Sequence, residues 1–93
     1  MTAGSDVFSD MMKEFAIASA NKGIRRAMEK GRPMDPWNHF DKGFIRLRLQ
    51  EEIAEWQNSV GYSTTLEMDE LKDIACLAGS LWAILTGWKE AAK

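Results

Sequence analysis

Three segments of the chain carry apolar residues at intervals of three and four positions, which is the spacing of one face of an α-helix. Both prolines and several of the glycines fall between these segments, where they end one helix before the next begins. The pattern predicts an all-α protein of 93 residues, with three main helices in a single domain over residues 1–93.

The first helix is predicted to run from about Asp6 to Lys30. Ser5 is its expected N-cap, and Gly31 is the expected residue after its C-terminus. The second helix is predicted to begin near Pro36, with Asp35 as N-cap and proline in the first helical position, and it leaves room for a kink before Gly43. The expected core stripe of this helix is Ile45, Leu49, Ile53, Trp56 and Val60.

The third helix is predicted to begin at Thr64, because Thr64-x-x-Glu67 has the form of a capping box. Its apolar stripe continues to Trp88 and is wide. A chain of this length buries little more than about 60% of its unfolded surface, yet 45% of its residues are hydrophobic. We therefore expect the helical bundle to be completed by oligomerisation, as a homodimer or homotetramer.

The charges are divided along the chain. Bases outnumber acids between Lys22 and Arg48, whereas acids outnumber bases between Glu51 and Asp73. A basic half beside an acidic half fits a polyanion bound together with its metal, such as a nucleoside triphosphate. The simpler alternative is a solvated surface with its charges in blocks. The net charge of −2 disfavours binding of a nucleic acid polymer.

Other classes of site lack the residues that they need. The single histidine and single cysteine, His39 and Cys76, offer neither a zinc site nor an internal disulfide. A reducing compartment, the cytoplasm, is expected, and no stretch is long and apolar enough to suggest a membrane partner.

Two pairs of carboxylates have matching spacing. Glu52 and Glu55 lie three residues apart on the second predicted helix, and Glu70 and Asp73 repeat this spacing on the third. Antiparallel packing of these helices would bring four carboxylates together, which suits Mg²⁺ or Mn²⁺. The alternative for one of them is a surface ion pair between Arg48 and Glu52.

The pattern Glu51-Glu52-x-x-Glu55 followed by Glu70-x-x-Asp73 resembles the signature of the MazG-like all-α nucleoside triphosphate pyrophosphatases, over roughly Arg46 to Leu85. The resemblance implies Mg²⁺-dependent hydrolysis of a (deoxy)nucleoside triphosphate to the monophosphate and pyrophosphate. It also implies metal ligation and catalysis by the acids of the motif. The implied metal ligands are Glu52, Glu55, Glu70 and Asp73. The implied catalytic residues are Glu51 and Glu52. Glu51 would act as a further ligand or as the group that orients the attacking water.

Basic and aromatic residues before the acidic motif are candidates for substrate binding. Lys42, Arg46 and Arg48 are expected to neutralise phosphate charge, and the basic end of the first helix, Lys22 to Met28, is either a phosphate contact on an exposed face or a solvated helix end. Trp37, with His39 and Phe40, either stacks on a nucleobase or caps the bundle. The rival function is a non-enzymatic helical oligomer, an interaction module whose acidic surface binds a basic protein.

Overall fold

The computed structural model describes residues 3–89 and is helical throughout its regular parts. Its elements are α1 (Ala3–Lys30), the short 3₁₀ helix η1 (Pro36–Asn38), α2 (Lys42–Ser59) and α3 (Thr64–Thr86). No strand occurs in residues 3–89, so the predicted all-α class is confirmed. Over the same residues, none of the helices combines the length and apolar character needed to cross a bilayer.

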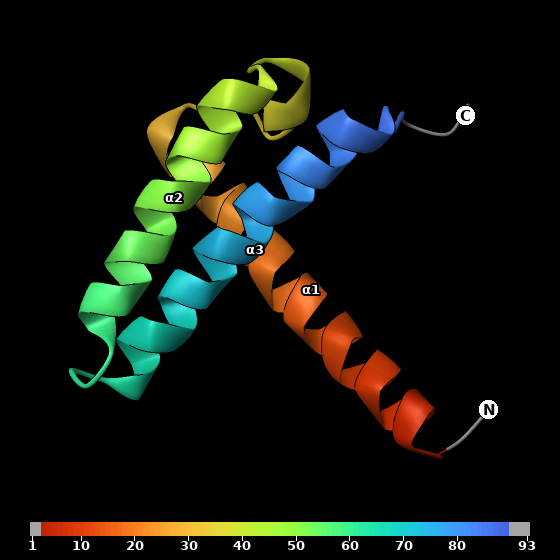
Figure 1. Ribbon diagram of the computed structural model, residues 1–93, viewed down its shortest axis with the longest axis vertical. Coiled ribbons are helices and arrows are strands. Elements are labelled where there is room, and N and C mark those ends of the chain that lie inside the picture. Colours follow the sequence, from red (N-terminus) through yellow and green to blue (C-terminus); the bar gives the residue numbers. More distant parts are fainter. Residues whose placement is uncertain (1–2, 90–93) are drawn as a thin grey trace.

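The helices α2 and α3 form an antiparallel hairpin, and α1 crosses α3 at a steep angle (Figure 1). The first half of α1 extends beyond this crossing and away from the hairpin. At about 1.5 Å per residue, the 28 residues of α1 span roughly 42 Å. Most of the contacts that hold α1 are made with α3.

The predicted end of the first helix is confirmed. The helix α1 ends at Lys30, and Gly31 takes a positive φ of 62°. The Arg32 N–H donates to the Ala27 carbonyl at 2.9 Å, which closes the end of the helix. The chain is already helical at Ala3, so Ser5 lies within α1 and is not its N-cap.

The predicted start of the second helix was wrong. Pro36 opens a three-residue 3₁₀ turn, and α2 begins at Lys42. The N-cap of α2 is Asp41, whose Oδ1 accepts from the Phe44 N–H at 2.8 Å. Asp35 makes no capping bond, because its carboxylate accepts instead from the Asn38 amide and pairs with His39.

The third helix begins where it was predicted, but with a different cap. Ser63 is the N-cap of α3, and its hydroxyl accepts from the Leu66 N–H at 2.9 Å. The carboxylate of Glu67 does not complete a capping box, because its Oε2 accepts from the Trp56 indole N–H at 3.1 Å. Glu67, which the sequence predicts to cap its own helix, therefore links α3 to α2.

The crossing of α1 and α3 depends on small residues. Ser19, Gly23 and Ala27 recur at intervals of four along α1, and they are buried or half-buried. The Cys76 thiol of α3 donates to the Ser19 carbonyl at 3.1 Å, and a Cβ built on Gly23 would lie 3.0 Å from Cys76 Sγ. Small side chains on α1 thus allow the two backbones to approach closely.

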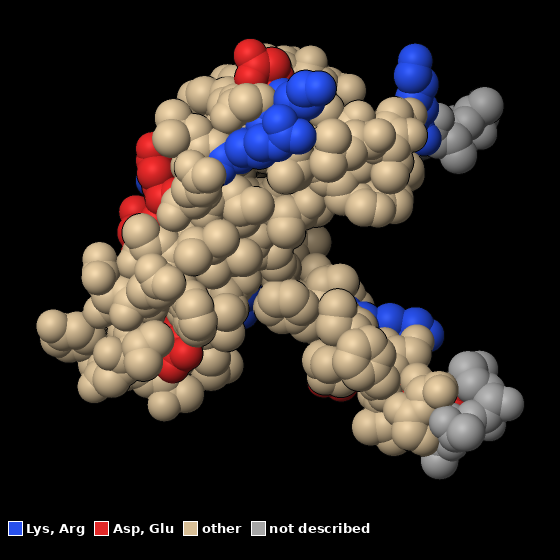
Figure 2. All heavy atoms as spheres, viewed as in Figure 1, with Lys and Arg blue, Asp and Glu red and all other residues tan. Residues whose placement is uncertain are grey.

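The apolar stripes are much less covered than the sequence predicts for core residues. Ile45 is 1% exposed, but most large apolar side chains remain accessible. The exposed residues of the three apolar stripes are Phe8, Met11 and Met12 in the first segment, Ile53 and Val60 in the second, and Leu71, Trp82, Leu85 and Trp88 in the third. Figure 2 shows a face on which charged atoms are sparse over the hairpin and the projecting part of α1.

Candidate metal centre

Three of the four predicted metal ligands come together between α2 and α3. Glu52 and Glu55 lie one turn apart on α2, and Glu70 lies opposite them on α3. Each offers a carboxylate oxygen, and these oxygens all lie within 4.8 Å of one another. We call Glu52, Glu55 and Glu70 the acidic triad. The antiparallel hairpin is what aligns the two halves of the motif.

Glu52 is the most buried member of the acidic triad, with 7% of its surface exposed. Its Oε1 accepts from the Arg48 guanidinium at 3.2 Å, but its buried Oε2 has no hydrogen-bond partner. Burial raises the pKa of Glu52 to about 7, and the neighbouring Glu55 carboxylate acts in the same direction. At neutral pH this carboxyl group is therefore poised between its protonated and charged forms.

Glu70 shows the same shortage of positive charge. Burial raises its pKa, the charges of Glu55 and Asp73 raise it further, and Lys22 opposes them. Its Oε2 is also buried without a hydrogen-bond partner. A hard divalent cation would supply the missing charge, and carboxylate oxygens are the ligands that Mg²⁺ and Mn²⁺ prefer. The residues present therefore fit such an ion.

Asp73, the fourth predicted ligand, has a different partner. Its Oδ2 lies 3.0 Å from Lys22 Nζ, and the same ammonium group donates to the Asp69 carbonyl at 2.8 Å. The prediction that Lys22 lies on an exposed basic face was wrong, because only 6% of this residue is exposed. The signal for its burial was the stripe of small residues on α1, since Lys22 lies on the same side of the helix as Ser19 and Gly23.

Arg48 lies beside the acidic triad and binds two carboxylates. Its Nη1 donates to Glu51 and its Nη2 to Glu52. The ion pair with Glu52 that the sequence offered as an alternative is therefore present. Glu51 is exposed, so it stands at the rim of the site, and Arg48 connects it to the buried Glu52.

An open groove of about 400 Å³ runs along the hairpin next to the acidic triad. Two of the three carboxylates, Glu55 and Glu70, line it. The rest of the lining is polar and apolar in turn: Asn58, Ser59, Tyr62 and Leu66. The groove gives a ligand access to the carboxylates from solvent.

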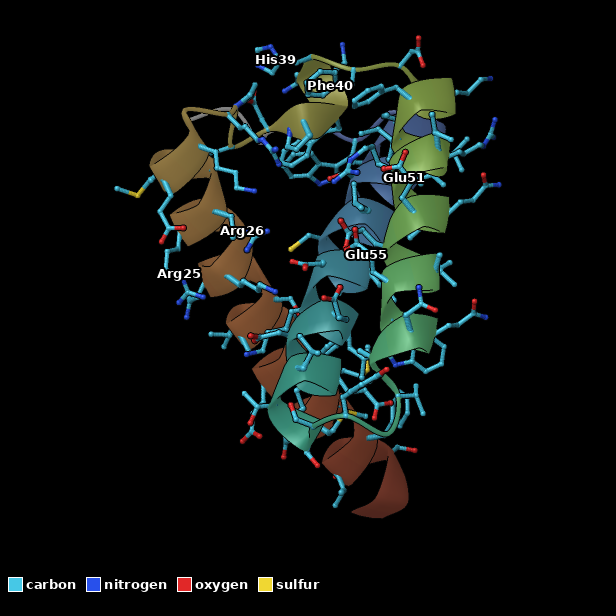
Figure 3. All side chains as sticks on the ribbon, turned by 90° about the vertical axis from the view of Figure 1, so that its left-hand side faces the viewer. Arg25, Arg26, His39, Phe40, Glu51 and Glu55 are labelled. Atoms are coloured by element: carbon cyan, nitrogen blue, oxygen red, sulfur yellow. The ribbon has the colours of Figure 1, made fainter. Side chains whose placement is uncertain are left out.

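The other basic residues predicted to bind substrate, Arg46 and Lys42, lie at increasing distances from the acidic triad. Arg46 and Lys42 are exposed on α2, six and ten residues before Glu52, which corresponds to about 9 Å and 15 Å along the helix. Figure 3 shows Glu51 and Glu55 on α2, with Arg25 and Arg26 on α1 across from them. Both arginines are exposed. In Figure 3 the Arg25 side chain points away from the hairpin, so the basic end of α1 does not direct all of its positive charge toward the acidic triad.

The aromatic residues of the linker lie at the far end of the hairpin. Trp37 packs edge-on against Trp88, with ring centroids 5.9 Å apart, and both line a hollow of about 560 Å³. Phe40 stacks on Phe44 at 4.7 Å. Another lining residue, Ile84, lies 14 positions from Glu70, or about 20 Å along α3. The contact of Trp37 with Trp88 is that of a residue that caps the bundle, whereas His39, Phe40 and Phe44 remain exposed.

Comparison of the chain with protein-family models, with curated proteins and with solved structures finds no match.

Proposed function

We propose that this chain is a Mg²⁺-dependent nucleoside triphosphate pyrophosphohydrolase, with Mn²⁺ as an alternative ion, that cleaves a (deoxy)nucleoside triphosphate to the monophosphate and pyrophosphate. The observation that carries the proposal is the convergence of carboxylate oxygens of Glu52, Glu55 and Glu70 to within 4.8 Å of one another. The Oε2 atoms of Glu52 and Glu70 are also buried without a hydrogen-bond partner. These are acids of the motif that resembles the MazG-like signature.

In this proposal the acidic triad holds the metal ion. A bound Mg²⁺ would neutralise charge on the phosphate oxygens and lower the pKa of a water molecule. Arg48 fixes the carboxylates of Glu51 and Glu52 relative to each other, so that Glu51 is positioned at the rim of the site, where it orients the attacking water. The chain then needs no serine, cysteine or histidine nucleophile.

Substrate binding would draw on the groove and the basic residues around it. Arg46 of α2 and Arg26 of α1 are exposed, and we assign them to the phosphate oxygens. Tyr62, at the edge of the groove, is 82% exposed and offers an aromatic face closer to the acidic triad than Trp37 does. Lys42 is farther away, and we assign it an effect on substrate affinity alone.

We propose further that the chain acts as a homodimer or homotetramer. The support is the projecting first half of α1, on which Val7, Phe8, Met11 and Met12 are exposed along one side of the helix. Isolated exposed apolar residues are normal, but a row of them along a projecting helix is typical of an interface. A second copy of the chain would offer the same apolar surface in return.

The same exposed surface also favours the rival function, a non-enzymatic interaction module. The two functions differ in their dependence on a metal ion. An interaction module has no reason to turn over a nucleotide, and its assembly needs only the apolar faces.

The deciding experiment follows a panel of nucleoside triphosphates by ³¹P NMR in the presence of Mg²⁺. We expect monophosphate and pyrophosphate as the primary products, and Glu52→Gln should reduce turnover by orders of magnitude. Glu29→Gln, which removes an exposed carboxylate from α1, is the matched control and should leave turnover unchanged. Orthophosphate as the primary product, or no turnover of any nucleotide, would favour the interaction module.

A further inference from the structure

Lys22 is a buried cation that α1 brings to the edge of the acidic triad. Lysine is almost never fully buried unless it is paired. Here the ammonium group forms an ion pair with the Asp73 carboxylate at 3.0 Å and donates a hydrogen bond to the Asp69 carbonyl at 2.8 Å. Both partners belong to α3. The side chain of Lys22 is thus directed into the helical hairpin and not toward solvent.

Asp73 interacts with both this lysine and the acidic triad. Its charge raises the pKa of both Glu52 and Glu70, so it lies within electrostatic reach of both. The charge of Lys22 lowers the pKa of Glu70, so the ammonium group also interacts electrostatically with the triad. A divalent cation bound there would repel Lys22 and attract Asp73.

The same ion pair joins α1 to the rest of the molecule. Among the ion pairs of residues 3–89, the pair between Lys22 and Asp73 is the one that connects α1 to α3. It lies beside the close crossing at which Ser19 and Gly23 meet Cys76. Weakening this pair would therefore loosen α1 at the point where it covers the thiol.

We propose that Lys22 competes with the metal ion of the acidic triad: it holds Asp73 out of the metal site and α1 against α3, and a bound divalent cation weakens this hold. This inference rests on the proposed metal site and assigns it a regulator within the chain. Coupling between two equilibria is reciprocal, so if the formed pair between Lys22 and Asp73 weakens metal binding by some factor, the bound metal weakens formation of this pair by the same factor.

The first test measures Mn²⁺ affinity on the full chain by electron paramagnetic resonance of the free ion. Lys22→Met should bind Mn²⁺ more tightly than wild type, by roughly fivefold or more. A purely structural role for Lys22 predicts the opposite, because a loosened site binds its metal less well. Lys72→Met is the matched control, since Lys72 pairs with Asp69 at 3.7 Å within α3, and its affinity should equal that of wild type.

A double substitution tests whether Lys22 weakens metal binding by holding Asp73 out of the metal site. If Lys22→Met binds tightly because it frees Asp73, then Lys22→Met with Asp73→Asn should return to an affinity close to that of wild type. An equally tight double variant would show that Asp73 takes no part in binding and would overturn this step.

The second test uses Cys76 as a reporter in the unchanged protein. The thiol is half-buried beneath α1, and burial raises its pKa, so it should react slowly with a disulfide reagent. Mn²⁺ or Mg²⁺ should accelerate this reaction in wild type, because a weaker pair between Lys22 and Asp73 exposes the thiol more often. In Lys22→Met the reaction should be fast without metal and indifferent to it. Because the wild-type measurement needs no substitution, it decides the question even for a variant that fails to fold.

The outcomes distinguish this inference from the proposed function. Failure of both wild type and Lys22→Met to bind Mn²⁺ would overturn the metal site and the inference together. Binding by Lys22→Met alone would support the competition directly. Binding by wild type with no gain in Lys22→Met, and no metal effect on the Cys76 reaction, would overturn the inference and leave the metal site in place.

Discussion

Gly23 of α1 lies directly against Cys76 of α3, so that a Cβ on the glycine would come within 3.0 Å of the sulfur atom. Gly79, which is also inside a helix, has no heavy atom within 4 Å of the corresponding position. The two glycines therefore have the same backbone preference but opposite surroundings. One is required by a close helix crossing, and the other is not.

This difference predicts opposite effects of the same substitution. Gly79→Ala should raise the free energy of unfolding by about 0.5–1 kcal/mol, because alanine favours the helix over glycine. Gly23→Ala gains the same preference but overpacks the crossing, and we expect a net loss of about 1 kcal/mol. Urea denaturation of both variants measures the difference. Adding Cys76→Ala to Gly23→Ala should restore stability, because it removes the sulfur atom that the new methyl group meets. If Gly23→Ala and Gly79→Ala stabilised the protein equally, the close crossing would be refuted.

The raised pKa of Glu52 predicts a pH dependence of stability. Folding raises this pKa from 4.5 to about 7, so the folded chain binds the proton more tightly than the unfolded chain does. The contribution of Glu52 to the free energy of unfolding therefore falls as the pH rises from about 4.5 to about 7. Glu52→Gln, which mimics the protonated form, lacks this fall.

Urea denaturation with a chelator present, at several pH values, tests the expectation. The stability of Glu52→Gln relative to wild type should increase across the interval from pH 4.5 to pH 7. A constant difference between the two proteins over that interval would mean that the fold does not hold the proton on Glu52.

Metal binding should stabilise the fold through the acidic triad. At a Mg²⁺ concentration of ten times Kd, linkage predicts about 1.4 kcal/mol, which raises Tm by several degrees in a chain of this size. Glu70→Gln should abolish this shift and cost little stability without metal, because it removes both a ligand and a source of repulsion. Calorimetry with and without Mg²⁺ measures both effects. Glu14→Gln on α1 is the control, and loss of its metal response would point to a general salt effect.

The projecting half of α1 predicts a self-association that one charge can break. Phe8 is 64% exposed in the single chain, so Phe8→Asp should not disturb the fold of the monomer but should oppose burial of α1 between copies. Sedimentation equilibrium at micromolar concentration should show a dimer or tetramer for wild type and a smaller species for the variant. Met34→Asp, at an exposed site outside the helices, should behave as wild type. A monomeric wild type would end the oligomer proposal.

Helix content was predictable because it depends on local spacing. The period of the apolar residues identified all three helices, and Gly31 correctly marked the end of α1. The starts were harder to predict, since Asp35 and Asp41 offer the same capping chemistry six residues apart. Only the competition from Asn38 and His39 for Asp35 leaves Asp41 as the N-cap of α2.

The candidate site was predictable in part for a similar reason. Spacing alone placed Glu52 and Glu55 on one side of a helix, and the hairpin adds Glu70. The partner of Asp73 was not predictable in this way, because Lys22 lies 51 residues away on a helix whose crossing angle no local pattern specifies. The exposed stripes were misjudged as core because periodicity identifies an apolar face without identifying what covers it.

The narrow crossing of α1 also has a consequence for the order in which the molecule opens. Because α1 packs chiefly against α3 while α2 and α3 form a hairpin of their own, α1 can detach and leave the hairpin intact. Native-state hydrogen exchange should then separate the amides into two groups, with those of α1 exchanging through a partial opening and those of α2 and α3 through a larger one. Two cooperative units would thus coexist in a chain of 93 residues.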